Sequence, residues 1–456
     1  MICGTPSRAD RLCRLRLATL ATLAITLALA GCVSYRPRPL PPAPRWATAP
    51  TDAAGHALQR LDLPQAAALA LRANPGYRAA LIDARISTLQ LRAAGLLPDP
   101  QLGVGVDHPS TPGYSQAWNL GLSEDLSALL TRGARLDAAR AQRTATRLQL
   151  AWQGWALAQG AAATYVDLWT AERRSALLTR QVQMARERDA AFAHALGNGD
   201  VTLESAAASL VTLSDAEAQL AAARQAQVVA QAQLNALLGL APAARYALVP
   251  PQTPPLPDRR ALDAALRALP HTRPDLLALA AGYGAADADF RAAVLAQFPG
   301  LSIGVSRASD TSRVQSSGLS ISLNLPIFGG AQARARIAAA TRERLHADYQ
   351  ARLDQADAEA RALSAQLAEV ARQRNRLQQR LPQLRTLAAR ADAAFAAGNL
   401  AGSAWAAIRQ SLLARELEAL DLTATLAKGQ VALAALLGRV PPGATALPAA
   451  VSGDSR

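Results

Sequence analysis

The chain carries one pattern of landmarks twice, and this duplication constrains its fold more than any single motif does. Each copy has an X-Pro pair, a proline leading into an alternating apolar segment, and a closing Leu-Leu-Gly. The copies keep nearly the same spacing: Pro75 and Pro274 are 199 positions apart, Pro98 and Pro299 are 201 apart, and Gly239 and Gly438 are 199 apart. Several shared landmarks in one order predict two structural repeats of one design.

The N-terminus has the features of a targeting segment. Four arginines precede an apolar stretch at 17–30, which is too short for a comfortable bilayer-spanning helix. The stretch ends in Leu29-Ala30-Gly31-Cys32, which resembles the lipobox of bacterial lipoproteins. That resemblance implies cleavage between Gly31 and Cys32, lipidation of Cys32, and retention in the outer membrane, because Val33 rather than Asp follows the cysteine. The alternative is an ordinary buried cysteine after a short anchor.

Cysteine and charge content narrow the function further. Cys3 and Cys13 would leave with the signal and Cys32 would be acylated, so no thiol would remain for a disulfide, a zinc site or catalysis. Removal of four arginines and Asp10 lowers the formal charge from +14 to +11. A basic balance can indicate nucleic acid or anionic lipid. Here the arginines are spread along helical segments among acids, so solvated helix faces are favoured and no nucleic-acid partner is expected.

Composition also divides the chain. We expect a lipoprotein signal peptide at 1–31, a lipidated Pro-rich tether at 32–57, a first structural repeat at 58–249, a Pro-rich linker at 250–257, a second repeat at 258–440 and a disordered tail at 441–456. Beyond the signal, no apolar run reaches 18 residues, so the sequence predicts no helical membrane span.

Each repeat is predicted to be mainly helical, with two strands. The first copy predicts helices at 64–73, 76–97, 132–196 and 202–238, with strands at 101–107 and 116–125. The second predicts helices at 258–269, 274–298, 331–397 and 400–437, with strands at 301–307 and 316–325. A helix of 65 residues would be roughly 100 Å long, and the shorter helices on either side of it would pack along its length as a rod.

The leucine spacing indicates how these helices pack. Leucines recur at intervals of seven, as in Leu213 and Leu220 or Leu426 and Leu433. This spacing favours coiled-coil packing, although an ordinary helical bundle would also satisfy it. Pro382 is expected to kink the second long helix.

The strand segments alternate between apolar residues on one side and small or polar residues on the other. In the last strand Leu319, Ile321 and Leu323 alternate with Ser320 and Ser322. The pattern fits either a membrane barrel with a wet lumen or a soluble sheet with one face on a core. Four strands cannot close a ring in lipid, where open edges leave unpaired backbone groups. Three chains would supply twelve strands, so the lipoprotein signal and the helical rod favour a trimeric barrel.

The segment that follows the last predicted strand resembles a known protein family. The run Pro326-Ile327-Phe328-Gly329-Gly330, preceded by Leu323-Asn324-Leu325, closely resembles the strand-to-helix signature of TolC-like outer-membrane efflux proteins. Asn74-Pro75, Ala93-Ala94-Gly95 and Ala397-Gly398-Asn399-Leu400 are also similar to that family. The resemblance extends from about Leu58 to Gly438, with both copies in the family's order.

The resemblance implies a mainly α fold with a small membrane β part. A homotrimer would form a 12-stranded outer-membrane barrel, continued by a long periplasmic α-helical, coiled-coil barrel. The function implied is a passive conduit that receives drugs or metal ions from an inner-membrane efflux transporter through a periplasmic adaptor (membrane fusion) protein. The turns Gly197-Asn198-Gly199-Asp200-Val201 and Gly398-Asn399-Leu400 would form the adaptor-docking tip. They would be hairpin turns in any helical reading of the sequence.

One stretch departs from the family's pattern. Some members narrow the tip with acidic residues just beyond the second turn, but here the matching residues are Gly402-Ser403-Ala404-Trp405-Ala406-Ala407. This stretch has no carboxylate, so we expect no acidic ring at these positions. Accordingly, single-channel recordings should show no divalent-cation block that maps to this stretch, and a strong block there would contradict the expectation.

An enzyme and a periplasmic scaffold protein are the two alternatives to a channel. An enzyme would need a set of catalytic residues. The five histidines are scattered and do not have the spacing of zinc ligands. The sequence also shows no glycine-rich phosphate-binding loop and no pair of carboxylates arranged for catalysis. No cofactor, metal site or catalytic residue is therefore expected. The stronger rival is a non-channel periplasmic coiled-coil lipoprotein acting as a scaffold, in which the four alternating segments would be incidental.

Overall fold

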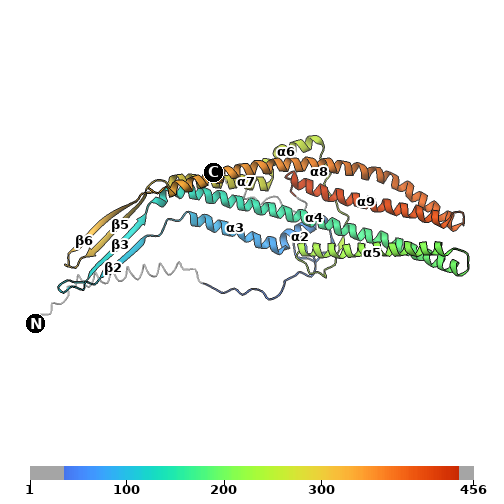
Figure 1. The fold of residues 1–456 in the computed structure, drawn as a ribbon, viewed down its shortest axis with the longest axis horizontal. Coiled ribbons are helices and arrows are strands. Elements are labelled where there is room, and N and C mark those ends of the chain that lie inside the picture. The colour runs from blue at the N-terminus through green and yellow to red at the C-terminus, as the bar shows by residue number, and fades with distance from the viewer. Residues whose placement is uncertain (1–34, 441–456) are drawn as a thin grey trace. The chain divides into compact units, whose positions relative to one another are not determined.

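The computed structural model describes residues 35–440 and shows the duplicated order of elements. From Ala47 onward these residues belong to one compact unit, drawn in Figure 1. In the first repeat the elements are β1 (Arg60–Leu61), α2 (Leu63–Ala73), α3 (Pro75–Ala94), β2 (Gln101–Asp107), β3 (Ala117–Asp125), α4 (Ser127–Gly197) and α5 (Leu203–Leu237). They are followed by β4 (Ala247–Leu248), α6 (Arg259–Thr272), α7 (Pro274–Leu295), β5 (Gly300–Ser309), β6 (Gln315–Asn324), α8 (Gly330–Ala396) and α9 (Gly402–Leu436).

Local sequence explains where several helices begin. Asp62 caps α2 through a capping box with Gln65, and the Asp258 carboxylate caps α6 by accepting from the Ala261 amide at 2.7 Å. Helix α4 starts at Ser127, five residues before the expected position, where the Asp125 carboxylate accepts from the Ser127 amide at 2.8 Å. Helix α6 continues through Pro270 to Thr272, past the expected end. Helix α8 likewise runs through Pro382 without ending, so the kink there stays a prediction.

The long helices are the axes of packing, as the helix lengths predicted. Helices α3 and α5 both pack on α4, and α7 and α9 both pack on α8. The two repeats meet along α4, which also packs on α7 and α9 (Figure 1). The heptad leucines face these contacts: Leu220, Leu426 and Leu433 are buried, and Leu213 is half-buried. None of the described helices is long and apolar enough to cross a membrane.

A small parallel sheet, which the sequence did not reveal, closes the first repeat. Strand β1 pairs with β4, joining residues that lie almost 190 positions apart. The fully buried Tyr165 of α4 ties this sheet down, because its hydroxyl lies 2.8 Å from the Leu61 carbonyl and accepts from the Val249 amide at 2.9 Å. Burial raises the pKa of Tyr165 to about 12, so the hydroxyl keeps its proton throughout the physiological range.

The duplication extends to individual hydrogen bonds at the start of α3 and α7. The Asn74 amide nitrogen donates to the Leu237 carbonyl at 3.1 Å, and Arg273 Nη1 donates to the Leu436 carbonyl at 3.3 Å, both across 163 residues. We call these two contacts the first and second junctions. Each junction thus satisfies one of the carbonyls that a helix C-terminus leaves without a partner.

A left-handed glycine follows each of these helix ends. Gly239 has φ +65 and Gly438 has φ +71. A Cβ at Gly239 would lie 2.7 Å from the Ala73 carbonyl oxygen, and one at Gly438 would lie 2.4 Å from the Thr272 hydroxyl. The closing Leu-Leu-Gly of each repeat is therefore a packing requirement as well as a turn.

Candidate functional site

The four strands form one antiparallel sheet with two open edges. The order is β2-β3-β5-β6, so β3 and β5 join the two repeats at the centre. The register pairs Leu122 with Val305 across that centre. Strands β2 and β6 have no partner on their outer sides within the described chain, and every residue of β6 is exposed.

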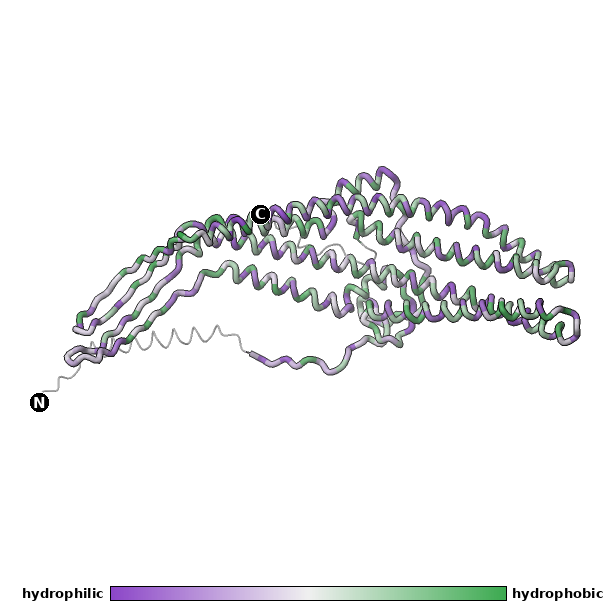
Figure 2. The backbone as a smooth tube through the Cα atoms, in the orientation of Figure 1, coloured by the Kyte–Doolittle hydropathy of each residue, from purple (hydrophilic) through white to green (hydrophobic). Residues whose placement is uncertain are grey.

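The two faces of the sheet differ as the alternation predicted. Because directly paired residues share a face, the register places all the large apolar strand residues on one side. Figure 2 shows the hydrophobic and hydrophilic positions that alternate along the strands. The apolar residues of that face are Leu102, Val104, Val106, Trp118, Leu120, Leu122, Leu301, Ile303, Val305, Leu319, Ile321 and Leu323. Two charged residues share the face: Arg307 is paired with Leu120, and Glu124 is paired with Ile303. It is not covered by the chain: Leu319 is 69% exposed and Val104 is also 69% exposed. A soluble sheet packed on its own core would bury this face.

The opposite face is lined by small and polar residues. Asn119, Gly121 and Ser123 of β3 are paired with Ala308, Ser306 and Gly304 of β5. Two of its glycines sit where a side chain would collide: a Cβ at Gly105 would lie 2.5 Å from the Asn119 amide, and one at Gly304 would lie 2.7 Å from the Ser320 hydroxyl. This face is therefore polar and has few protruding side chains, which suits the lumen side of a membrane barrel.

The family signature forms the link from sheet to helix. Residues 325–329 join β6 to α8, and Gly329 takes the left-handed conformation with φ +73. Ile327 is 74% and Phe328 is 95% exposed. With Phe298 and the starts of α4 and α8 they border a cavity of about 520 Å³ at the base of the sheet. The signature thus presents large apolar side chains that no described residue covers.

The two predicted tip turns lie together at the end of the helices far from the sheet (Figure 1). Both are built in the same way. Gly199 and Gly398 have φ +81 and +76, and the next residue in each case closes the turn: the Asp200 amide donates to the Ala195 carbonyl at 2.9 Å, and the Asn399 amide to the Ala394 carbonyl at 2.8 Å. These residues are exposed or half-buried.

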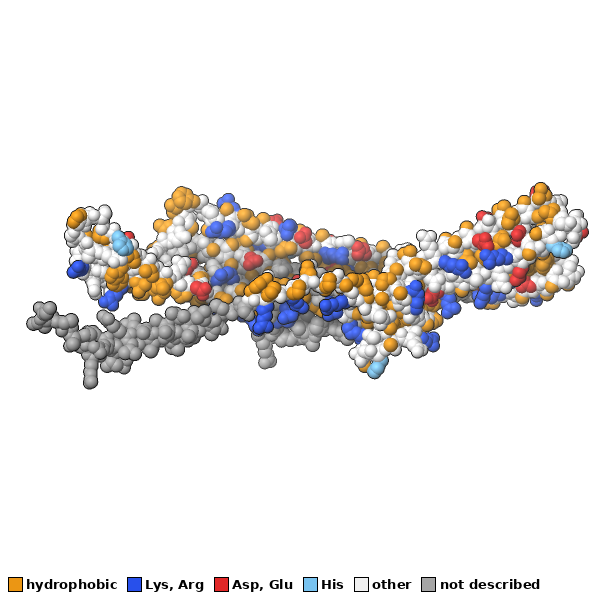
Figure 3. Space-filling model, turned by 90° about the horizontal axis from the view of Figure 1, so that it is seen from below, with side chains coloured by type: hydrophobic (Ala, Val, Ile, Leu, Met, Phe, Trp, Pro, Cys, Tyr) orange, Lys and Arg blue, Asp and Glu red, His pale blue; other side chains and the backbone are white. Residues whose placement is uncertain are grey.

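Each helical hairpin is also bridged at an equivalent ion pair. Arg186 of α4 lies 2.6 Å from Glu217 of α5, and Arg385 of α8 lies 2.9 Å from Glu416 of α9. The paired positions differ by 199 in both cases. Figure 3 shows such charges interspersed along the helices, as solvated helix faces require. Since exposed pairs contribute only about 0–1 kcal/mol each, they help to set helix register more than stability.

The start of α9 makes contacts that distinguish the second hairpin. Trp405 stacks on Phe395 of α8 with ring centroids 4.9 Å apart, and its indole nitrogen donates to the Asp392 carboxylate at 2.7 Å. Asp392 also lies 3.3 Å from Arg409 Nε. The stretch after the second turn therefore uses a carboxylate from α8 to pair with an arginine of its own helix.

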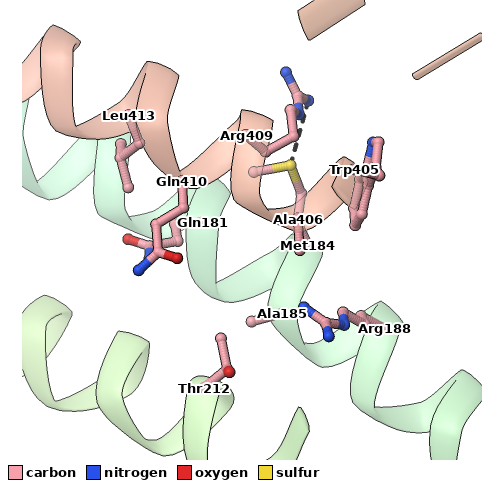
Figure 4. Close-up of a pocket in the computed structure, with 10 residues that line it drawn as sticks. All are labelled: Gln181, Met184, Ala185, Arg188, Thr212, Trp405, Ala406, Arg409, Gln410 and Leu413. Carbon is pink, nitrogen blue, oxygen red and sulfur yellow. Dashed lines mark hydrogen bonds between the residues drawn. The ribbon is translucent and has the colours of Figure 1, made fainter. Parts of the chain in front are cut away.

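Beside this contact lies a cavity of about 110 Å³ between α4, α5 and α9 (Figure 4). Helix α9 supplies Trp405 and Arg409, α4 supplies Gln181, Met184 and Arg188, and α5 supplies Thr212. Arg409 Nη2 lies 3.3 Å from the Met184 sulfur. We call this space the hairpin pocket.

A cluster of charged residues joins α7, α8 and α4 between the sheet and the tip turns. Arg273, which is fully buried, makes a two-point contact with Asp275 at 2.9 and 2.6 Å, and Arg352 of α8 donates to the same carboxylate at 2.8 Å. Both guanidinium groups face the Trp152 ring of α4, at 5.0 and 5.9 Å. Burial alone would raise the pKa of Asp275, but the two arginines more than offset it and lower the pKa.

Gly31 and Cys32 lie outside the described residues, as do the signal peptide and the tail. Within residues 35–440 no group of three or more His, Cys, Asp or Glu side chains is arranged to hold a metal ion. Sequence reasoning treated Arg273-Pro274 only as a landmark and missed its cluster. The signal was present, because an arginine at the position equivalent to Asn74, two residues before an aspartate, is a candidate buried ion pair.

Comparison with known families identifies the second repeat most directly. Residues 266–439 match the family model described as "Outer membrane efflux protein". This range contains the signature at 326–330 and the second tip turn, so the resemblance seen in the sequence is confirmed. A search of curated protein sequences finds no match.

Solved structures extend the agreement to the whole fold. The structure of CusC is 19% identical, covers 90% of this chain and 99% of its own, and has a TM-score of 0.70. The outer membrane channel CmeC of Campylobacter jejuni is 15% identical, covers 86% and 88% respectively, and has a TM-score of 0.71. The open state of the Neisseria gonorrhoeae MtrE outer membrane channel is 19% identical, covers 91% and 99%, and has a TM-score of 0.66. At these identities the likeness concerns the fold, and the predicted mainly α class with a small β part is confirmed.

Proposed function

We propose that this chain, a TolC-like outer-membrane efflux protein, forms a homotrimeric channel in which three four-stranded sheets close one barrel. The observation that carries the proposal is a sheet with two open edges and an uncovered apolar face. Edge β6 of one copy would pair with edge β2 of the next, so that twelve strands leave no backbone group unpaired in lipid. The apolar face would then meet the acyl chains, and the small polar face would line the lumen.

The helices would continue this wall into the periplasm as a coiled-coil barrel. The hairpin turns at 197–201 and 398–400 would be the end that docks a periplasmic adaptor protein. An inner-membrane transporter would supply the energy and deliver drugs or metal ions, since the chain itself offers only a passive conduit. Cys32, acylated after cleavage of the signal peptide, would fasten the mature N-terminus to the outer membrane, because each buried acyl CH₂ contributes about 0.8 kcal/mol.

Two neighbouring residues of β6 test the orientation of the sheet. Leu319→Arg places a charge on the proposed lipid face, where it should cost about 2–4 kcal/mol and greatly reduce the heat-sensitive trimer band in outer-membrane extracts. Ser320→Arg, one position along, should leave the trimer intact but change the ion selectivity of single channels in planar bilayers.

The matched pair also separates the channel from a scaffold. A periplasmic coiled-coil lipoprotein would give no channel and no detergent-resistant β signal, and it would treat both arginines alike. Equal trimer yields for the two variants, or the opposite order, would refute the proposed orientation.

A further inference from the structure

The hairpin pocket contains buried polar atoms without a partner. Gln181 Oε1 and Arg188 Nε are inaccessible to solvent and make no hydrogen bond within the described chain. Arg409 Nε is also inaccessible and has the Asp392 carboxylate at 3.3 Å, but no hydrogen bond of good geometry. All three residues line the same cavity of about 110 Å³. A buried donor or acceptor left unsatisfied costs about 1–3 kcal/mol, so the Gln181 acceptor and the Arg188 donor beside one cavity indicate that something occupies it.

The charge of the pocket indicates what the occupant is. Arg188 of α4 and Arg409 of α9 contribute guanidinium groups from two hairpins, and no acidic residue lines the cavity. Asp392 pairs with Arg409 Nε at 3.3 Å and also accepts from Trp405 at 2.7 Å, and Glu187 accepts from Gln183 at 3.2 Å. Arg188 forms no ion pair within the described chain, so its charge is left for an occupant of the pocket. Arginine forks match a planar carboxylate best, since they offer two parallel N–H donors.

The rest of the lining is apolar and partly aromatic. Trp405, Met184, Ala185, Ala406 and Leu413 supply carbon and sulfur surface beside the two arginines (Figure 4). The cavity is large enough for a few water molecules or one small ring, since a water takes about 30 Å³ of liquid volume. A flat apolar body with one carboxylate would fill the space and satisfy the guanidinium donors.

We propose that the hairpin pocket binds small aromatic carboxylates, held by Arg188 and Arg409 and packed against Trp405 and Leu413. This site goes beyond the proposed conduit function, because it lies within the helical wall of a single chain. An occupant would contact α4 and α9 together and thereby join the two hairpins close to the tip.

Binding can be measured by isothermal titration calorimetry on the full-length trimer in detergent, with benzoate as the probe. Benzyl alcohol, which keeps the ring without the charge, and acetate, which keeps the charge without the ring, are the ligand controls. We expect saturable binding of benzoate, one molecule per chain, and at least tenfold weaker binding of both controls.

Variants of two arginines on α4 provide the matched comparison. Arg188→Met should weaken benzoate binding at least tenfold, whereas Arg180→Met, two turns away on an exposed position outside the pocket, should change it less than twofold. Arg409→Met should resemble Arg188→Met provided that its trimer band is intact; otherwise Arg188→Met decides. No saturable heat, equal binding of benzyl alcohol, or equal effects of Arg188→Met and Arg180→Met would each overturn the proposal and indicate a water-filled cavity. The conduit function would be unaffected by that outcome, because channel conductance is recorded separately.

Discussion

The first and second junctions perform the same backbone task with different chemistry. At the first, Asn74 donates to the Leu237 carbonyl while its side-chain oxygen accepts from the Tyr77 amide at 2.9 Å, capping α3. At the second, Arg273 donates to the Leu436 carbonyl and provides no cap for α7. The neutral amide of Asn74 is enough to bind a helix-end carbonyl. The buried charge of Arg273 is therefore expected to have a second structural role.

The difference lies in what each residue joins. Asn74 links α3 to the end of α5 within one repeat. Arg273 holds Asp275 of α7 and faces Trp152 of α4, and Asp275 in turn binds Arg352 of α8. The second junction therefore connects the two repeats as well as closing its own. Both repeats have a side chain that donates to the last turn of a helix. Only in the second repeat does that side chain also connect the two repeats.

The largest expected effect comes from Arg273→Ala. Removing one partner of a buried pair leaves the other charge poorly compensated, which should lower stability by about 3 kcal/mol. The measurement is the thermal unfolding midpoint of the detergent-solubilised protein by circular dichroism. Arg352→Ala is the matched control, because Arg352 is 27% exposed and leaves the two-point contact in place, so its loss should cost less. A smaller effect for Arg273→Ala than for Arg352→Ala would show that the second junction does not depend on the buried charge.

The next largest effect is expected in the pH dependence of stability, because only the second junction contains a titrating group, Asp275. Its pKa is lowered in the folded state by Arg273 and Arg352, so its contribution is present above the unfolded value of 3.8 and is lost as the pH falls through the folded value. Wild-type protein should therefore lose stability below about pH 4. Asp275→Asn should be less stable at neutral pH and should lack this part of the acid loss. Parallel pH curves for the two proteins would contradict the assignment.

The smallest effect is expected at the first junction. Asn74→Ala removes a helix cap and one donor to a helix end, which should cost about 1–2 kcal/mol. The same unfolding assay should show no dependence on pH for this difference, because the amide does not titrate. Asn74→Asp keeps the cap acceptor but loses the donor to Leu237, so it separates the two contributions. If Asn74→Ala and Arg273→Ala lowered the free energy of unfolding equally, the two junctions would not differ in the way proposed.

Periodicity predicted the architecture well because helices and strands here are long and regular. The strands at 101–107 were placed with the bounds that the structure has, and the alternation assigned Leu319 and Ile321 to one face. The tip turns followed from Gly199 and Gly398, whose left-handed conformation only glycine adopts readily. Local signals sufficed wherever a residue's role depended on its immediate neighbours in the chain.

Contacts between distant residues were not predictable in the same way. Strands β1 and β4 have two residues each, too few for an alternation to be seen. The hairpin pocket is lined by Arg188 of α4 and Arg409 of α9, and the pattern of neither helix alone shows that the two face one cavity. Cross-repeat contacts such as Arg273 with Trp152 could be found only once α7 was placed on α4.

The two open edges of the sheet have a consequence for biogenesis. If the chain acts as the proposed trimer, a single protomer has unpaired strand edges at both β2 and β6, and insertion would wait until three copies have met. The rate of that encounter rises steeply with local concentration. Expression level would therefore set the fraction of chains that reach the bilayer.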